Sequence, residues 1–100
     1  VPMLQGADDG KYKEAFEKHV LPTLLSYKPE LIFLSAGYDA HIDDPLGGMR
    51  VTTDGFRWMV KELVTLSNEL CDGRLIATLE GGYDVISLRN SVEASLEEML

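Results

Sequence analysis

Two short runs of apolar residues constrain the fold of this chain more than any other feature. The runs are Leu31–Leu34 and Leu75–Leu79. Each is too short for a free-standing helix, and the first is too continuous for a strand with one face in water. We therefore expect two buried strands of a parallel sheet, the first of them buried on both faces.

Helical periodicity occupies most of the remaining sequence. Apolar residues recur at near-helical spacing in three segments, Lys11–Tyr27, Phe56–Leu70 and Val85–Met99. In the last segment the expected apolar stripe consists of Val85, Leu88, Val92, Leu96 and Met99. Pro22 interrupts the first segment, and a kink near Lys18–Pro22 is expected because proline has no N–H group for the Lys18 carbonyl. Val1–Leu4 is interpreted as the end of a further strand.

The alternation of strand and helix predicts a single α/β domain over residues 1–100. Such an order gives a parallel β-sheet with right-handed crossovers and helices on both faces. The chain begins at Val1 without a methionine, and we interpret it as a piece of a longer protein.

Composition and charge exclude several classes of function. The net charge of -8, with only 9 basic residues, argues against a nucleic-acid partner, because phosphate binding needs clustered Lys and Arg. Cys71 is the only cysteine, so an internal disulfide is impossible and a cytoplasmic location is expected. No apolar run approaches the roughly 18 residues of a membrane span, so no membrane partner is expected.

Polar residues gather directly after the two predicted strands. Asp39, His41, Asp43 and Asp44 follow the first strand, and the turn Glu80–Asp84 follows the second. Because ligands bind at the carboxyl ends of parallel strands, we expect these two loops to lie side by side and share one site.

The residue types in these loops leave two interpretations open. Asp39, His41 and Asp44 could bind a divalent metal, since carboxylates and imidazole suit zinc and its neighbours. Alternatively, these polar groups cap turns and face water. Tyr83 could hydrogen-bond a ligand or only cover the sheet edge, and phosphate binding at its turn is excluded because Glu80 would repel an anion.

The two loops together carry a specific pattern. SAGYDAHIDDPLGG at residues 35–48, followed after a helix by ATLEGGYD at residues 77–84, closely resembles the histone deacetylase superfamily. The resemblance includes acetoin-utilisation and acetylpolyamine-amidohydrolase types. It covers essentially the whole chain, because VPMLQGADDGKYKEAF at residues 1–16 resembles the segment that precedes this site in the family.

The resemblance implies a zinc-dependent amide hydrolase with the arginase/deacetylase fold and an acetylated lysine or polyamine as substrate. Asp44, directly before Pro45, matches a Zn²⁺ ligand of the family. Tyr83 matches the tyrosine whose hydroxyl helps to polarise the substrate carbonyl and stabilises the oxyanion. Gly81 and Gly82 match the turn beside the substrate pocket.

The resemblance also implies that most of an active site is absent from these residues. The family's tandem histidines and its Asp-x-His zinc ligands belong upstream of Val1. Asp39 and His41 have the Asp-x-His spacing, but the resemblance gives neither a metal-binding role. The chain thus resembles the C-terminal portion of a deacetylase, and alone we expect it to bind no zinc tightly, to be inactive and to self-associate. The alternative is a non-catalytic α/β interaction module with a deacetylase-like scaffold.

Overall fold

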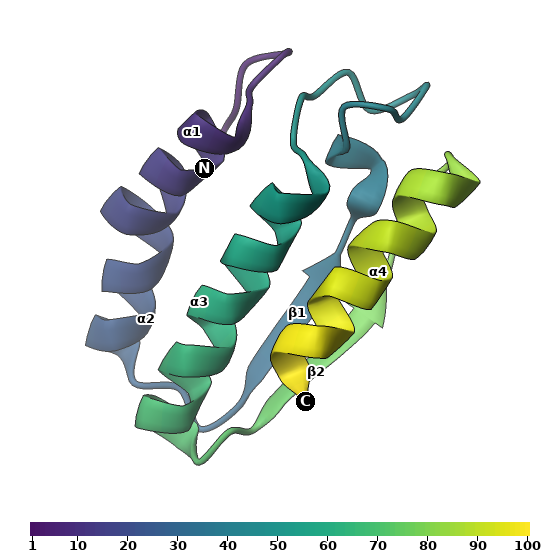
Figure 1. Ribbon diagram of the computed structural model, residues 1–100. Coiled ribbons are helices and arrows are strands. Elements are labelled where there is room, and N and C mark those ends of the chain that lie inside the picture. The colour runs from purple at the N-terminus through teal and green to yellow at the C-terminus, as the bar shows by residue number, and fades with distance from the viewer.

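Two parallel strands and a layer of helices make up the computed structural model, which describes all residues from Val1 to Leu100 (Figure 1). The elements in chain order are α1 (Asp9–Ala15), the π-helical turn η1 (Phe16–Val20), α2 (Leu21–Tyr27), β1 (Ile32–Ala36), the 3₁₀ turn η2 (Tyr38–Ala40), α3 (Thr53–Cys71), β2 (Leu75–Leu79) and α4 (Val85–Met99). No helix is both long and apolar enough to span a membrane.

The strands β1 and β2 pair in parallel, as the sequence predicts. Their register runs from Ile32 opposite Leu75 to Ala36 opposite Leu79. The helix α3 connects them, so both strands end at the same edge of the sheet. The α/β prediction with a parallel sheet is therefore confirmed, and β2 has the predicted bounds.

The prediction that the helices cover both faces of the sheet is wrong within this chain. Figure 1 shows α3 and α4 in front of the strands, α1 and α2 beside α3, and no helix behind the strands. Side chains alternate along a strand, so Ile32 is buried while Phe33 is 61% exposed. Ile76, the register partner of Phe33, is 50% exposed. The strand β1 is thus buried on one face, and its apolar opposite face is open.

The core lies between the covered face of the sheet and the helices. Tyr38, Val51, Phe56 and Met59 form its central cluster. The predicted stripe on α3 is confirmed, since most of it is buried, namely Phe56, Met59, Val60, Leu63 and Leu66.

The predicted last helix is confirmed as α4, with the bounds that its apolar stripe indicates, but its fully buried residues are small ones beside that stripe. Its buried residues are Ser87, Ser91, Ala94 and Ser95, and these let α4 approach α3 closely. Val85 is 79% exposed and Leu96 is 52% exposed. Leu88 and Val92 are half-buried against the core cluster, so the open part of the stripe consists of Val85 and Leu96.

Local sequence signals set the helix ends and one irregularity. Thr52 caps α3 by accepting the Gly55 N–H, the role for which threonine is favoured at a helix start. The expected irregularity before Pro22 is present as η1, where the Leu21 N–H bonds the Phe16 carbonyl five residues back. Val1–Leu4 forms no strand, contrary to the prediction, because it pairs with neither β1 nor β2.

Candidate active site at the carboxyl ends of the strands

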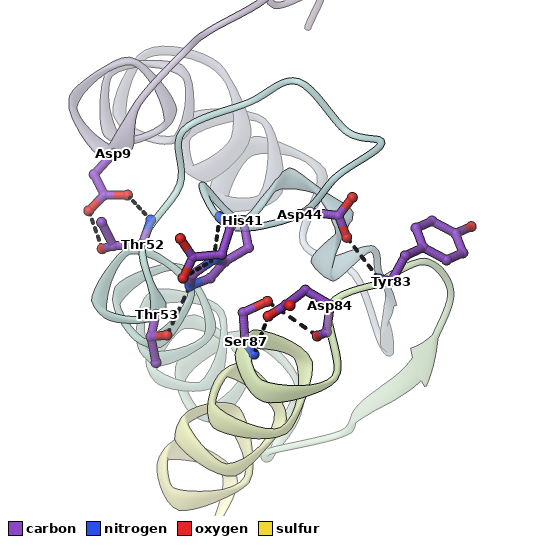
Figure 2. Close-up of polar contacts among 9 residues, drawn as sticks. Asp9, His41, Asp44, Thr52, Thr53, Tyr83, Asp84 and Ser87 are labelled. Carbon is purple, nitrogen blue, oxygen red and sulfur yellow. Dashed lines mark hydrogen bonds and ion pairs between the residues drawn. The ribbon is translucent and has the colours of Figure 1, made fainter.

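The two polar loops meet at the carboxyl ends of β1 and β2 (Figure 2). The Tyr38 N–H donates to the Gly81 carbonyl at 2.7 Å. The Tyr83 N–H donates to Oδ2 of Asp44 at 2.8 Å, a contact across 39 residues of sequence. The expectation that these loops lie side by side is therefore confirmed.

The carboxylate of Asp44 is held by backbone N–H groups. Its Oδ1 accepts from Leu46 at 2.8 Å and from Gly47 at 3.0 Å, which closes the turn that begins at Pro45. Desolvation acts to raise the pKa of Asp44, but hydrogen bonds from the N–H groups of Leu46, Tyr83 and Gly47, together with the nearby N–H of Asp84, lower it below its ordinary value. Asp44 is consequently ionised at neutral pH.

The hydrogen bonds of Asp44 leave room for a cation on one oxygen. A carboxylate offers about four acceptor positions, two on each oxygen. Both positions of Oδ1 are used by the turn, whereas Oδ2 accepts a single hydrogen bond, from Tyr83. The residue therefore fits the role of one oxygen ligand to a metal, through Oδ2.

The phenol of Tyr83 is free to meet a ligand. Its side chain is 59% exposed and makes no hydrogen bond within the chain. Figure 2 shows the ring extending away from the helices, while the backbone of the same residue is held by Asp44. The tyrosine thus combines a fixed backbone with an available hydroxyl.

Close packing and, at Gly82, the backbone conformation favour glycine at the two positions before Tyr83. A Cβ on Gly81 would lie 2.8 Å from the carboxylate of Asp39. Gly82 has a φ of +147°, and a Cβ there would lie 2.7 Å from Cδ1 of Leu88. Glycine at these positions lets the turn pack against the loop that follows β1.

His41 is occupied by structural contacts. Its side chain is buried, and its ring stacks on Phe56 with 6.3 Å between centroids. Nδ1 accepts the Asp43 N–H at 3.0 Å, so the ring proton resides on Nε2, which lies 3.1 Å from Oγ1 of Thr53. Neither nitrogen is left for a metal.

The interpretation of Asp39, His41 and Asp44 as a three-ligand metal site is wrong. No three His, Cys, Asp or Glu side chains in the structure are placed to hold one metal ion. The carboxylate of Asp39 lies instead against Gly37 and Gly81. Burial raises the pKa of the Tyr12 phenol, and the negative charge of Asp39 raises it further. Asp39 therefore faces a tyrosine and two glycines.

Two further aspartates organise the site, and the sequence reasoning assigned neither of them this role. Asp84 caps α4 by accepting the Ser87 N–H at 2.9 Å, which lowers the pKa of Asp84. The Asp-x-x-Ser spacing at the start of the last helix is a signal that could have found this cap. Asp9 accepts hydrogen bonds from Thr52, and no local pattern indicates a partner so distant in sequence.

The fold and the paired loops define an α/β domain of the arginase/deacetylase fold, and solved structures agree. The chain superposes on the crystal structure of the HDA15 HD domain with a TM-score of 0.87 and 36% identity, covering 97% of this chain and 26% of that one. For the histone deacetylase Clr3 the TM-score is 0.86 at 30% identity, with 96% and 16% covered.

Sequence comparison names the family. The profile of the Histone deacetylase domain family matches residues 1–99, and the chain belongs to this family. It is 38% identical over 100 residues to Histone deacetylase 14, chloroplastic, of Arabidopsis thaliana, and covers 24% of that protein. It is 36% identical over 85 residues to a Probable deacetylase of Archaeoglobus fulgidus, and again spans 24% of its length.

Proposed function

We propose that this chain is the C-terminal part of a zinc-dependent deacetylase domain that cleaves an acetylated amine, either lysine or a polyamine. Asp44 is one of the zinc ligands, and Tyr83 acts on the substrate carbonyl. The observation that carries the proposal is the hydrogen bond from the Tyr83 N–H to Oδ2 of Asp44. It places the backbone of Tyr83 against the carboxylate of Asp44. These are the two residues that match the zinc ligand and the carbonyl-polarising tyrosine of the family that the chain resembles.

Zinc, when bound, supplies a Lewis acid for the amide carbonyl and lowers the pKa of its water to about 7. Asp44 is suited to hold it because its charge is kept by N–H groups and one position of Oδ2 remains open. A catalytic zinc site needs three protein ligands, and Asp44 supplies one. The other two come from residues outside this sequence.

Tyr83 contributes a hydrogen-bond donor beside this carboxylate. Its phenol O–H donates to the carbonyl oxygen of the substrate and stabilises the negative charge that develops there. A fixed donor of this kind is worth about 3 kcal/mol, or roughly a hundredfold in rate. The backbone bond to Asp44 keeps the base of the side chain at a set distance from the metal ligand, while the exposed ring can turn toward the substrate.

The test is Tyr83→Phe in the complete domain that contains this chain, assayed with an acetyl-lysine peptide and an acetylated polyamine. We expect kcat to fall at least about a hundredfold while substrate binding changes little. Tyr27→Phe is the matched control, because Tyr27 is also exposed and lies at the other end of β1, before the strand begins.

Unchanged turnover in Tyr83→Phe would overturn the role of the tyrosine. A complete domain that binds no zinc and cleaves neither substrate would overturn the enzyme assignment and favour a non-catalytic interaction module. The relative rates on the two substrates choose between a lysine and a polyamine deacetylase.

A further inference from the structure

The loop that carries Asp44 is attached to the start of the chain. The Gly6 N–H donates to the Gly48 carbonyl at 2.9 Å, and the Arg50 N–H donates to the Ala7 carbonyl at 2.9 Å. These two bonds pair the segment Gly6–Asp9 with the segment Gly48–Thr52. The second segment lies directly between the Asp44 turn and α3.

Asp9 closes this pairing with both of its carboxylate oxygens (Figure 2). Oδ1 accepts the Thr52 N–H at 2.8 Å, and Oδ2 accepts the Thr52 hydroxyl at 2.6 Å. Hydrogen bonds to a carboxylate are roughly twice as strong as those between neutral groups. The same threonine caps α3, so Asp9 also fixes where α3 begins.

The carboxylate of Asp9 fills a space that is open because a neighbouring residue, Gly55, has no side chain. Gly55, in the first turn of α3, is buried, and a Cβ there would overlap the Asp9 carboxylate. Asp8, one residue earlier, caps α1 by accepting the Lys11 N–H, and its side chain makes no hydrogen bond to the loop. Two adjacent aspartates thus have separate tasks, one local and one 43 residues away.

We infer that Asp9 is a positioning residue for the metal-ligand loop, which it fixes at Thr52 so that the Asp44 carboxylate stays oriented. The loop is then held at both ends. Asp44 bonds Tyr83 and its own turn at one end, and Asp9 holds Thr52 at the other. Because the role of Asp44 belongs to the proposed function, the catalytic importance of Asp9 rests on that function.

The test is amide hydrogen exchange of the chain in Asp9→Ala, with Asp8→Ala as the matched control. The amides to follow are those bonded to the Asp44 carboxylate, namely Leu46, Gly47 and Tyr83. Asp9→Ala should exchange these amides about tenfold faster, since two charge-assisted hydrogen bonds are lost. The core amides of Leu63 and Leu66 should keep their rates, which a general loss of stability would not allow.

Asp9→Asn keeps one acceptor oxygen and provides a milder variant in case Asp9→Ala unfolds. It should give a smaller acceleration at the same three amides. Rates at these amides no faster than in Asp8→Ala would overturn the inference, and so would an equal acceleration at Leu63. None of these rates depends on zinc or substrate, so the result is separate from that of Tyr83→Phe in the complete domain.

Discussion

The edge of the sheet at Asp44 and the open face of the sheet at Phe33 differ in whether their side chains find partners within the chain. At the edge, the polar groups of Asp44 and His41 find their partners within the chain. On the open face, Phe33 and Ile76 remain largely exposed. Hydrogen bonds need only a few correctly placed neighbours, whereas burying apolar area needs a second surface. These residues therefore build the scaffold of a site but leave part of a core uncovered.

The largest effect is expected from breaking the polar edge at Gly47. A Cβ there would overlap the backbone carbonyl of Asp39, which cannot turn aside as a side chain can. We expect Gly47→Ala to lower the free energy of unfolding by about 3 kcal/mol, as overpacking of rigid sites does. Urea unfolding measures the change.

Gly10→Ala is the control for that substitution. Its Cβ would lie 3.4 Å from the Asp8 carboxylate, an ordinary contact in the first turn of α1. The free energy of unfolding should stay the same or rise slightly, since alanine favours a helix over glycine. Equal losses in both variants would mean that the contact between Gly47 and Asp39 is not what holds the loop.

The open face should instead govern association between molecules. An exposed apolar surface on an unpaired sheet favours contact with another copy, so we expect self-association. Phe33→Thr combined with Ile76→Thr should weaken it by roughly tenfold or more, because an apolar side chain contributes about 1.5–3 kcal/mol when buried. Sedimentation at several concentrations measures this, with Leu25→Gln on α2 as an exposed control.

A monomer at every concentration, for the unaltered chain, would refute this expectation. Unfolding of the double variant in urea should differ from the unaltered chain by only about 0.5 kcal/mol, because both positions are exposed. This small difference applies at concentrations where the unaltered chain is a monomer, and a larger loss at higher concentrations is what self-association through this face predicts.

Acid should loosen the polar edge and leave the open face unaffected. The pKa of Asp44 in the folded chain lies below its ordinary value of 3.8. Its ionised form therefore contributes stability above about pH 3.8, and the contribution is lost as the pH falls through the folded pKa. The amide resonances of Leu46, Gly47 and Tyr83 should shift together below pH 3.8. A midpoint above that value, or a transition that persists in Asp44→Asn, would contradict this assignment.

The smallest expected effect is that of zinc on the chain alone. A single carboxylate cannot hold zinc against water, so calorimetry should show no saturable site in the submicromolar range. A tight site that is lost in both Asp39→Ala and His41→Ala would contradict this result. It would show that the loop after β1 rearranges around a metal, with His41 released from Asp43 and Thr53.

The sequence predicted the elements better than it predicted their surfaces. Strand β2 and the cap of α3 at Thr52 follow from local chemistry, which the sequence carries directly. The exposure of Phe33, and of Val85 and Leu96 on α4, depends on which other surface lies against each side chain, and hydrophobic periodicity carries no information about that surface. The sequence showed that α4 has an apolar stripe but not that its serines would face α3.

For the candidate site, the sequence predicted which loops come together but not the individual contacts of their side chains. The adjacency of Asp44 and Tyr83 follows from parallel strands that end at one edge, and the structure has it. Two other features depend on contacts that only the folded chain makes. Asp44 bonds the backbone N–H of Tyr83 and not its side chain, and His41 is buried with a hydrogen-bond partner at each ring nitrogen. The pairing of Asp9 with Thr52 joins residues 43 positions apart and has no local signal.

The two long-range bonds of the site have a consequence for the order of folding. Asp9 bonds Thr52 and Asp44 bonds Tyr83, and each of these contacts closes a loop of about forty residues. Closing a loop of this length lowers the conformational entropy of the chain before the new contacts contribute any favourable free energy. Non-local contacts therefore form later than local ones. During synthesis Asp44 leaves the ribosome long before Tyr83 does. The local bonds from Leu46 and Gly47 can form early, but we expect the bond to Tyr83 to form late, once β2 has paired with β1.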